Sequence, residues 1–474
     1  MKTYPVYLNG NWAGMGDSIP VINPASGENF ARMSVVDRAQ VAQAITDAHA
    51  AFDSWRQVPG RGRGEILEKI ADEVERRREE IARIITLENG KPITQSQGEV
   101  ALTVDHLRWF AGEARRIYGR VVPPQIETKR HLVIKTPVGV VAAISPWNFP
   151  LVLAVRKVAP ALAAGCTVIL KPASSTPLSA VAFAECVAVA APPNGVFQLV
   201  AGKAVDIAAE FLENPLCRKI TFTGSTEVGK KLIAGAARRV KPLSLELGGN
   251  APLIVFDDCP VDDAVKGTLM AKFRNTGQSC IAANRIYVQR GVYAAFLRSL
   301  AEKVRALVVG DGMDPNTQIG PLIDEEAVAK AEEHVQDAVG GGAKLLCGGK
   351  RLERPGYFFE PTVLEGVGRN SLCMYEETFA PIAPVTPFES EKEVVELANN
   401  SNFGLSAYVF TRAAARMFRL AENLDAGTIG INDGLPTVSH CPFGGTKQSG
   451  WGRELGTEGM DAFLETKHIS IEME

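Results

Sequence analysis

Residues 138–171 read VGVVAAISPWNFPLVLAVRKVAPALAAGCTVILK, two short apolar runs separated by a segment of helix length. Continuous apolar runs are typical of strands buried on both faces, and a strand, a helix and a second strand make up a parallel βαβ unit. More such runs follow: VFQLV (196–200), KITFT (219–223), SLEL (244–247) and PLIVF (252–256). The sequence therefore predicts an α/β fold around a buried parallel sheet.

A chain of 474 residues exceeds what one hydrophobic core usually organises. The segments on either side of the predicted sheet are therefore expected to form further structural units. Residues 118–136 are extended and polar, which is typical of a protruding hairpin. A second alternating block from 250 to about 430 predicts another α/β domain, and residues 467–473 (KHISIEM) predict a terminal strand. The N-terminal part predicts short strands over 4–30, then helices over 41–55, 65–88 and 98–117, the first preceded by a capping box of Asp37 and Gln40.

The composition is that of an ordinary globular protein, with 46% hydrophobic and 22% charged residues. A net charge of −3 provides no basic field for nucleic acid or an anionic membrane, which favours small-molecule chemistry. The 8 cysteines stand singly without a CxxC pair, so they indicate neither zinc nor a dithiol and fit a reducing cytoplasm. Residues 138–155 come nearest to a membrane span, but Pro146 and Pro150 interrupt them, and no signal peptide or anchor is indicated.

Parallel sheets bind ligands at the carboxyl ends of their strands, so the residues after the apolar runs are candidates for function. Asn148 stands between two prolines, where its amide could donate to a developing oxyanion or simply satisfy the turn backbone. Lys171 follows TVIL and could bind ribose hydroxyls or balance a phosphate. Gly224 and Ser225 open a helix, whose N-terminus suits a pyrophosphate, although no GxGxxG fingerprint is present.

Two residues could carry the reactive groups. Cys280 ends FRNTGQSC (273–280), where Gly277 allows close approach; a thiolate there could be a nucleophile, whereas most cysteines are simply buried. Glu246 stands at a strand end among apolar neighbours. Burial would raise its pKa and suit it to general-base work, and the alternative is a structural ion pair.

Seven motifs, in this order, resemble the aldehyde dehydrogenase family over essentially the full chain: PWNFP, KPASSTP, FTGSTEVG, ELGGNAP, FRNTGQSC, EETFAP and PFGGTKQSG. The resemblance implies a Rossmann-like cofactor domain (1–117 and 137–247) and an α/β catalytic domain (248–447). It implies a β oligomerisation arm with the tail (118–136 and 448–474), and hence a homodimer or homotetramer.

The resemblance also implies that a small-molecule aldehyde is oxidised to an acid with NAD or NADP. Cys280 would add to the aldehyde, Asn148 would hold the oxyanion, and Glu246 would activate the water that hydrolyses the thioester. Ser174 stands where NAD-preferring relatives commonly carry an acid, so its neutral hydroxyl predicts that NADP is accepted beside NAD. The implied cofactor residues are Trp147, Lys171, Ser174, Gly224, Ser225, Glu377 and Phe379, and no metal is implied.

Within the family, several short sequence segments are most similar to those of succinate-semialdehyde dehydrogenases. Arg156 and Arg285 match the positions that in this subgroup supply a charge clamp for a carboxylate at the far end of the substrate. Lactaldehyde, glycolaldehyde or an aromatic aldehyde is the alternative, since similar arginines occur in relatives that oxidise hydroxyaldehydes. Ala282 replaces a second cysteine that some members use as a redox partner, and Ala380 replaces the glycine of EExFGP. Residues 435–440 also depart from the subgroup, and His440 could polarise a substrate or merely pack.

Three other classes compete with this interpretation. A binding protein that keeps the fold without turnover is disfavoured by intact Cys280, Glu246 and Asn148. A CoA-acylating dehydrogenase would generally lack the base at Glu246. A zinc alcohol dehydrogenase would need ligands at metal-binding spacing, and a Ser/Tyr/Lys alcohol dehydrogenase would need a GxGxxG motif after a strand. The sequence contains neither.

Overall fold

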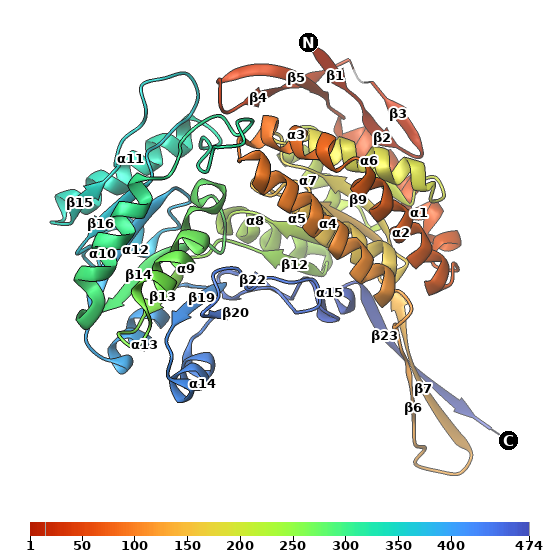
Figure 1. Cartoon of the computed structure of the whole chain (residues 1–474). Coiled ribbons are helices and arrows are strands. Elements are labelled where there is room, and N and C mark those ends of the chain that lie inside the picture. Colours follow the sequence, from red (N-terminus) through yellow and green to blue (C-terminus); the bar gives the residue numbers. More distant parts are fainter. Residues whose placement is uncertain (15, 474) are drawn as a thin grey trace.

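A computed structural model describes residues 1–14 and 16–473. Two large sheets, each flanked by helices, make up the body, and a narrow arm of strands projects from it (Figure 1). The first sheet has the order β22-β12-β11-β8-β9-β10-β2-β3, with its five central strands parallel. Its strands are β2 (Val6–Leu8), β3 (Asn11–Ala13), β8 (Val140–Ile144), β9 (Thr167–Lys171), β10 (Phe197–Leu199), β11 (Cys217–Thr223), β12 (Leu243–Glu246) and β22 (Gly450–Trp451).

Eight helices accompany the first sheet: α1 (Arg38–Trp55), α2 (Gly60–Arg76), α3 (Arg78–Asn89), α4 (Ile93–Glu113), α5 (Val152–Ala164), α6 (Leu178–Ala190), α7 (Ala204–Glu213) and α8 (Thr226–Ala236). The predicted capping box is confirmed, because Asp37 and Gln40 bond each other's backbone at the start of α1. The single helix predicted over 65–88 is wrong, since the chain breaks at Arg77 (φ −98°, ψ 16°) into α2 and α3. Hydrophobic spacing continues across this break, so periodicity alone could not reveal it.

The second sheet has the order β15-β16-β17-β14-β13-β19-β20. Alternate residues of β13 face opposite sides: Leu253 and Val255 join one apolar core, and Ile254 joins the other. The strands are β13 (Ala251–Val255), β14 (Ala283–Gln289), β15 (Lys344–Cys347), β16 (Thr362–Glu365), β17 (Ile382–Phe388), β19 (Ser406–Phe410) and β20 (Thr428–Ile431). The helices are α9 (Val261–Phe273), α10 (Arg290–Arg305), α11 (Glu325–Gly340), α12 (Leu372–Tyr375), α13 (Glu391–Asn399) and α14 (Ala414–Asn423).

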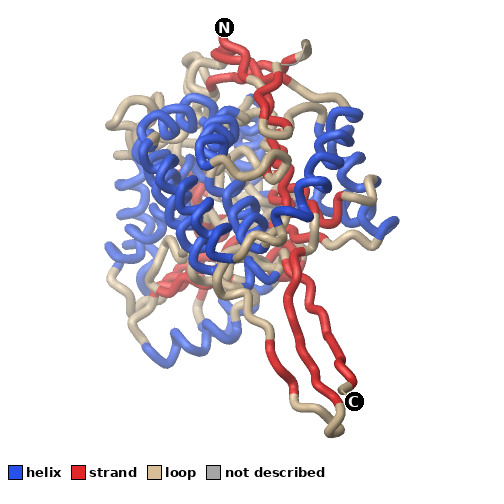
Figure 2. The backbone as a smooth tube through the Cα atoms, turned by 90° about the vertical axis from the view of Figure 1, so that its right-hand side faces the viewer, coloured by secondary structure: helices blue, strands red, loops and turns tan. Residues whose placement is uncertain are grey.

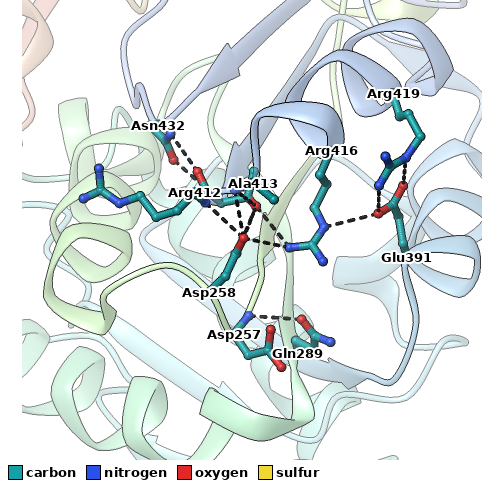
Figure 3. Close-up of polar contacts among 10 residues, drawn as sticks. Asp257, Asp258, Gln289, Glu391, Arg412, Ala413, Arg416, Arg419 and Asn432 are labelled. Atoms are coloured by element: carbon teal, nitrogen blue, oxygen red, sulfur yellow. Dashed lines mark hydrogen bonds and ion pairs between the residues drawn. The ribbon is translucent and has the colours of Figure 1, made fainter.

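A charged cluster fastens two of these helices to the sheet (Figure 3). The N-cap of α14 is Ala413, which has no side chain to accept a hydrogen bond. Asp258, just beyond β13, takes this role: its carboxylate accepts from the Ala413 N–H at 2.9 Å and pairs with Arg416 at 3.0 Å. Glu391, the first residue of α13, bridges Arg416 and Arg419. A carboxylate at the helix N-terminus both caps it and complements its dipole.

The projecting arm confirms the predicted hairpin and terminal strand. It consists of β6 (Arg120–Val122), β7 (Lys129–Pro137) and β23 (Leu464–Glu472), and β23 runs antiparallel to β7 over nine residue pairs. Figures 1 and 2 show all three strands extending away from the body. The preceding strand β22 departs from the predicted grouping of 448–474 with the arm, because it forms the edge of the first sheet.

The remaining elements are small. One sheet joins β1 (Lys2–Tyr4), β5 (Glu28–Ser34) and β4 (Ser18–Asn23), and another joins β18 (Phe403–Gly404) to β21 (Thr446–Lys447). A short helix, α15 (Glu458–Asp461), precedes the arm strand β23. None of the helices in the described part of the chain combines the length and apolar character that crossing a bilayer requires.

Candidate active site

Cys280 lies in a turn between α9 and β14 and packs against the apolar core of the first sheet. The turn is closed by a hydrogen bond from the Ala282 N–H to the Ser279 carbonyl at 2.9 Å. The approach is tightly folded, because Asn275 and Thr276 adopt positive φ angles of 50° and 57°. Gly277 also has a positive φ, and a Cβ there would lie 2.3 Å from the Ala380 carbonyl oxygen. Glycine is therefore required for the close approach of these two segments.

Asn148 follows β8 and is held beside this turn. Its side-chain amide donates to the Gln278 carbonyl at 3.1 Å, two residues before Cys280. Its own carbonyl accepts from Lys91 Nζ at 2.7 Å and Asn275 Nδ2 at 2.8 Å. Lys91 is fully buried and pairs with Glu99 at 2.6 Å. Asn148 is therefore held by partners that lie far away in the sequence.

Glu246 ends β12 with its carboxyl group buried, and its Oε2 has no hydrogen-bond partner among the described residues. Burial raises the pKa of Glu246 well above the ordinary value, and the nearby Glu454 carboxylate adds to this effect. Lys157 and Arg156 oppose the rise. Lys157 is itself buried, where it forms an ion pair with Glu454 and donates to Thr223 Oγ1 at 2.5 Å. The Glu246 carboxylate is therefore a stronger base than an exposed glutamate, and it forms only at a higher pH than an ordinary carboxylate does.

The electrostatics at Cys280 differ from the expected thiolate. Burial raises the pKa of the Cys280 thiol to about 12, and the negative charge of Glu377 contributes. Arg156 opposes this effect without cancelling it. The chain's own groups therefore keep Cys280 as a neutral thiol at physiological pH.

A cavity of about 440 Å³ opens beside Cys280 and contains two cationic groups. Arg156, on α5, is buried with its Nε unpaired, and its guanidinium lies 4.8 Å from the Phe443 ring centre. Arg274 lines the same cavity, with its guanidinium 4.9 Å from the Phe149 ring centre. The carboxylate in the wall, Glu99, is already paired with Lys91. The cavity is therefore suited to a ligand that has an anionic end.

One predicted substrate residue, Arg285, lies outside the cavity, as does His440, and one residue that lines the cavity was not predicted. Arg285 donates to the backbone carbonyls of Asn250, Leu397 and Ala398 and does not line the cavity, so its predicted clamp role is corrected. His440 is exposed and packs against Trp109, with ring centres 6.1 Å apart. Arg274 takes the place of Arg285 in the cavity. It stands six residues before Cys280 within the quoted motif, a position that the sequence alone does not distinguish from that of Arg285.

On the other side of Cys280, the predicted nicotinamide-side residues come together. The rings of Trp147 and Phe379 meet edge to face, with centres 5.4 Å apart. Glu377 Oε1 accepts from the Gly249 N–H at 2.9 Å, and its backbone carbonyl accepts from Lys330 Nζ at 2.7 Å. Burial raises the pKa of Glu377 to about 7. An aromatic pair with a fixed carboxyl group is suited to a flat ring carrying a sugar.

The residues predicted to hold the adenine side lie at the carboxyl ends of β9 and β11. Lys171 is 6% exposed, its ammonium makes no hydrogen bond or ion pair within residues 1–14 and 16–473, and burial lowers its pKa to about 8. Ser174 is exposed three residues later, and Ser225 caps α8 by accepting from the Val228 N–H at 3.4 Å. The Gly224 N–H is already bonded to the Glu246 carbonyl, so it is no free donor for a phosphate. The unpaired Lys171 still fits a dinucleotide bound at these strand ends.

The aldehyde dehydrogenase family model matches residues 12–469. The chain belongs to the aldehyde dehydrogenase family. It is 47% identical to glutarate-semialdehyde dehydrogenase from Pseudomonas aeruginosa over 98% of this chain and 97% of that protein. It is also 47% identical to NADP-dependent succinate-semialdehyde dehydrogenase from Escherichia coli, again over 98% and 97%. The crystal structure of an NADP-dependent E. coli enzyme superposes with a TM-score of 0.98 at 46% identity, covering 99% of this chain and 98% of that one. The predicted family and fold class are thereby confirmed.

Proposed function

We propose that this aldehyde dehydrogenase oxidises succinate semialdehyde, or a close analogue with a remote anionic group, to the carboxylic acid. The observation that carries the proposal is the presence of Arg156 and Arg274 in the same cavity as Cys280. Two cations, the buried Arg156 and the half-buried Arg274, have no ion-pair partner in the described part of the chain and favour a substrate that brings its own anion. The relatives named for succinate and glutarate semialdehydes agree with this class.

The carbon of the aldehyde would be attacked by Cys280 as its thiolate. The oxyanion formed can accept from the Asn148 amide and from the Cys280 N–H, which bonds no acceptor in the described structure. When bound, NAD or NADP supplies the hydride acceptor and a cationic ring, the latter favouring the thiolate.

The resulting thioester on Cys280 would then be hydrolysed. Glu246 takes a proton from water as the water oxygen bonds the acyl carbon, and the carbon–sulfur bond breaks to release the acid and the Cys280 thiolate. The raised pKa of Glu246 makes it a stronger base than an exposed glutamate. Trp147, Phe379 and Glu377 would hold the nicotinamide end of the dinucleotide, and Lys171 and Ser225 would hold the adenine end.

We expect Arg274→Leu to raise KM for succinate semialdehyde about 30-fold, because a charge-assisted hydrogen bond contributes about 2 kcal/mol. Arg156→Leu should act in the same direction. Butanal has the same number of carbons without the carboxylate and serves as the matched control substrate. Steady-state rates with both aldehydes make the comparison, and equal losses for the two would contradict an anion clamp. A preference for lactaldehyde, glycolaldehyde or benzaldehyde would keep the chemistry and overturn the substrate.

Cofactor choice depends on the charge at position 174. The exposed, neutral Ser174 does not repel a 2'-phosphate, so we expect turnover with both NADP and NAD. Ser174→Glu should lower kcat/KM for NADP by about tenfold or more while sparing NAD, because the carboxylate would repel the phosphate. Ser174→Gln is the control, because glutamine has nearly the same size as glutamate and carries no charge. An equal loss with both variants would attribute the change to size rather than charge.

We further propose that the protein assembles as a homodimer or homotetramer through the arm and acts in the cytoplasm. The arm supports assembly because it projects from the body with large apolar side chains exposed, namely Tyr118 (72%), Val121 (73%) and Ile126 (51%). Such side chains on a projecting sheet favour burial against another chain. All eight thiols are unpaired, which agrees with a reducing compartment.

A further inference from the structure

Tyr408 lies in β19, the second strand from one edge of the second sheet, between β13 and β20. Its side chain is completely buried in the apolar core that includes Leu253 and Phe273. The hydroxyl group donates to the Ile281 carbonyl at 2.6 Å. Ile281 directly follows Cys280, so this hydrogen bond joins the sheet to the turn that carries the thiol.

The other side of this turn is also confined. A Cβ on Gly249 would lie 2.3 Å from the Cys280 carbonyl oxygen, so the backbone of Gly249 lies against the turn. The Tyr408 hydroxyl and Gly249 therefore limit the rotation of the two peptide groups that follow the Cys280 Cα. The direction of the Cys280 N–H and Sγ depends on that backbone.

The hydroxyl acts as a donor and not as a proton acceptor. Burial raises the pKa of Tyr408, and the positive charge of Arg274 opposes this only in part, so the phenol stays protonated. A phenylalanine would fill the same core volume and would lack only this hydrogen bond. The chemical reason for a tyrosine at this position is therefore the Ile281 carbonyl.

We propose that Tyr408 is a positioning residue for the nucleophile: its hydroxyl holds the Ile281 carbonyl and so aligns Cys280 with the Asn148 amide. This inference rests on the proposed role of Cys280. Misalignment weakens the two donors that face the developing oxyanion, which raises the barrier without changing how the remote end of the aldehyde is bound. The loss should therefore appear in kcat rather than in KM.

The test compares Tyr408→Phe with Tyr293→Phe. Tyr293, on α10, also donates its hydroxyl to a backbone carbonyl, that of Val385 at 3.3 Å, but Val385 lies in β17 and not in the turn that carries Cys280. We expect Tyr408→Phe to lower kcat about tenfold with KM for aldehyde and cofactor within about twofold, and Tyr293→Phe to keep both constants. Rates are normalised to the folded fraction from circular dichroism, so partial unfolding of either variant does not enter the comparison.

A double-mutant cycle with Asn148→Ala separates positioning from a general loss of structure. If Tyr408 acts by aligning Cys280 with the amide, the two losses in kcat should combine to less than their product. If the double variant loses kcat by the full product of the two single losses, the inference is overturned. It is also overturned if Tyr408→Phe and Tyr293→Phe have the same kcat. Full activity of Cys280→Ala would instead overturn the proposed function, so the two failures are distinguishable.

Discussion

Cys280→Ala is expected to abolish aldehyde oxidation, with kcat falling by at least about 10⁴-fold, because no other group can form the acyl-enzyme. Cys280 is the thiol that lines the cavity with Arg156 and Arg274. The matched control is Cys347→Ala, which removes another partly exposed thiol from the edge strand β15. Formation of NADH or NADPH, followed by absorbance, measures both variants.

The same thiol gives a pH signature. Since burial raises the pKa of Cys280 to about 12, its alkylation by iodoacetamide in the absence of NAD or NADP should accelerate through neutral and alkaline pH without a plateau. Comparing wild type with Cys280→Ala isolates this thiol from the other seven. A plateau near pH 7 would show that the free chain already stabilises the thiolate. Retained oxidation by Cys280→Ala would reject the covalent mechanism altogether.

Glu246→Gln is expected to leave acylation intact and slow hydrolysis, lowering kcat about 10²- to 10⁴-fold. The change should therefore appear as a rapid burst of about one NADH per active site and a slow steady state. The wild type should lose kcat as pH falls through the raised pKa of Glu246, because only the carboxylate accepts the proton. The acid limb should thus lie above the range of an ordinary glutamate.

Glu454→Gln is the matched control for this base. Its charge raises the pKa of Glu246, so removing it should move the acid limb to lower pH while a base remains. Rapid-mixing and steady-state measurements across pH separate the two variants. An unchanged steady state in Glu246→Gln, or a faster steady state when CoA is added to the wild type, would favour an acceptor other than water.

The strand ends were predictable from sequence because buried apolar runs have clear limits. The structure ends β9 at Lys171 and β12 at Glu246, and it places Asn148 shortly after β8. The choice between Arg274 and Arg285 was not predictable, since both stand within six residues of Cys280 and only the path of the chain decides which guanidinium enters the cavity.

Contacts between segments that are far apart in the chain could also not be predicted from the sequence. Lys91 reaches the Asn148 carbonyl across 57 residues, and Tyr408 reaches Ile281 across 127. Nothing in local spacing marks either residue, because a lysine after a glycine and a tyrosine in an apolar strand both have ordinary structural explanations. Long-range packing alone gives them these positions.

The pairing of β22 with β12 has a consequence for the order in which the protein becomes active. Gly450 lies opposite Glu246, and Glu454, which helps to raise the pKa of Glu246, follows four residues later. A ribosome adds roughly 5–20 residues per second, so the first sheet's central strands emerge many seconds before these partners. Until residues 450–454 have emerged, the nascent chain therefore carries Glu246 without the neighbour that helps to raise its pKa, so this base reaches its final strength late in synthesis.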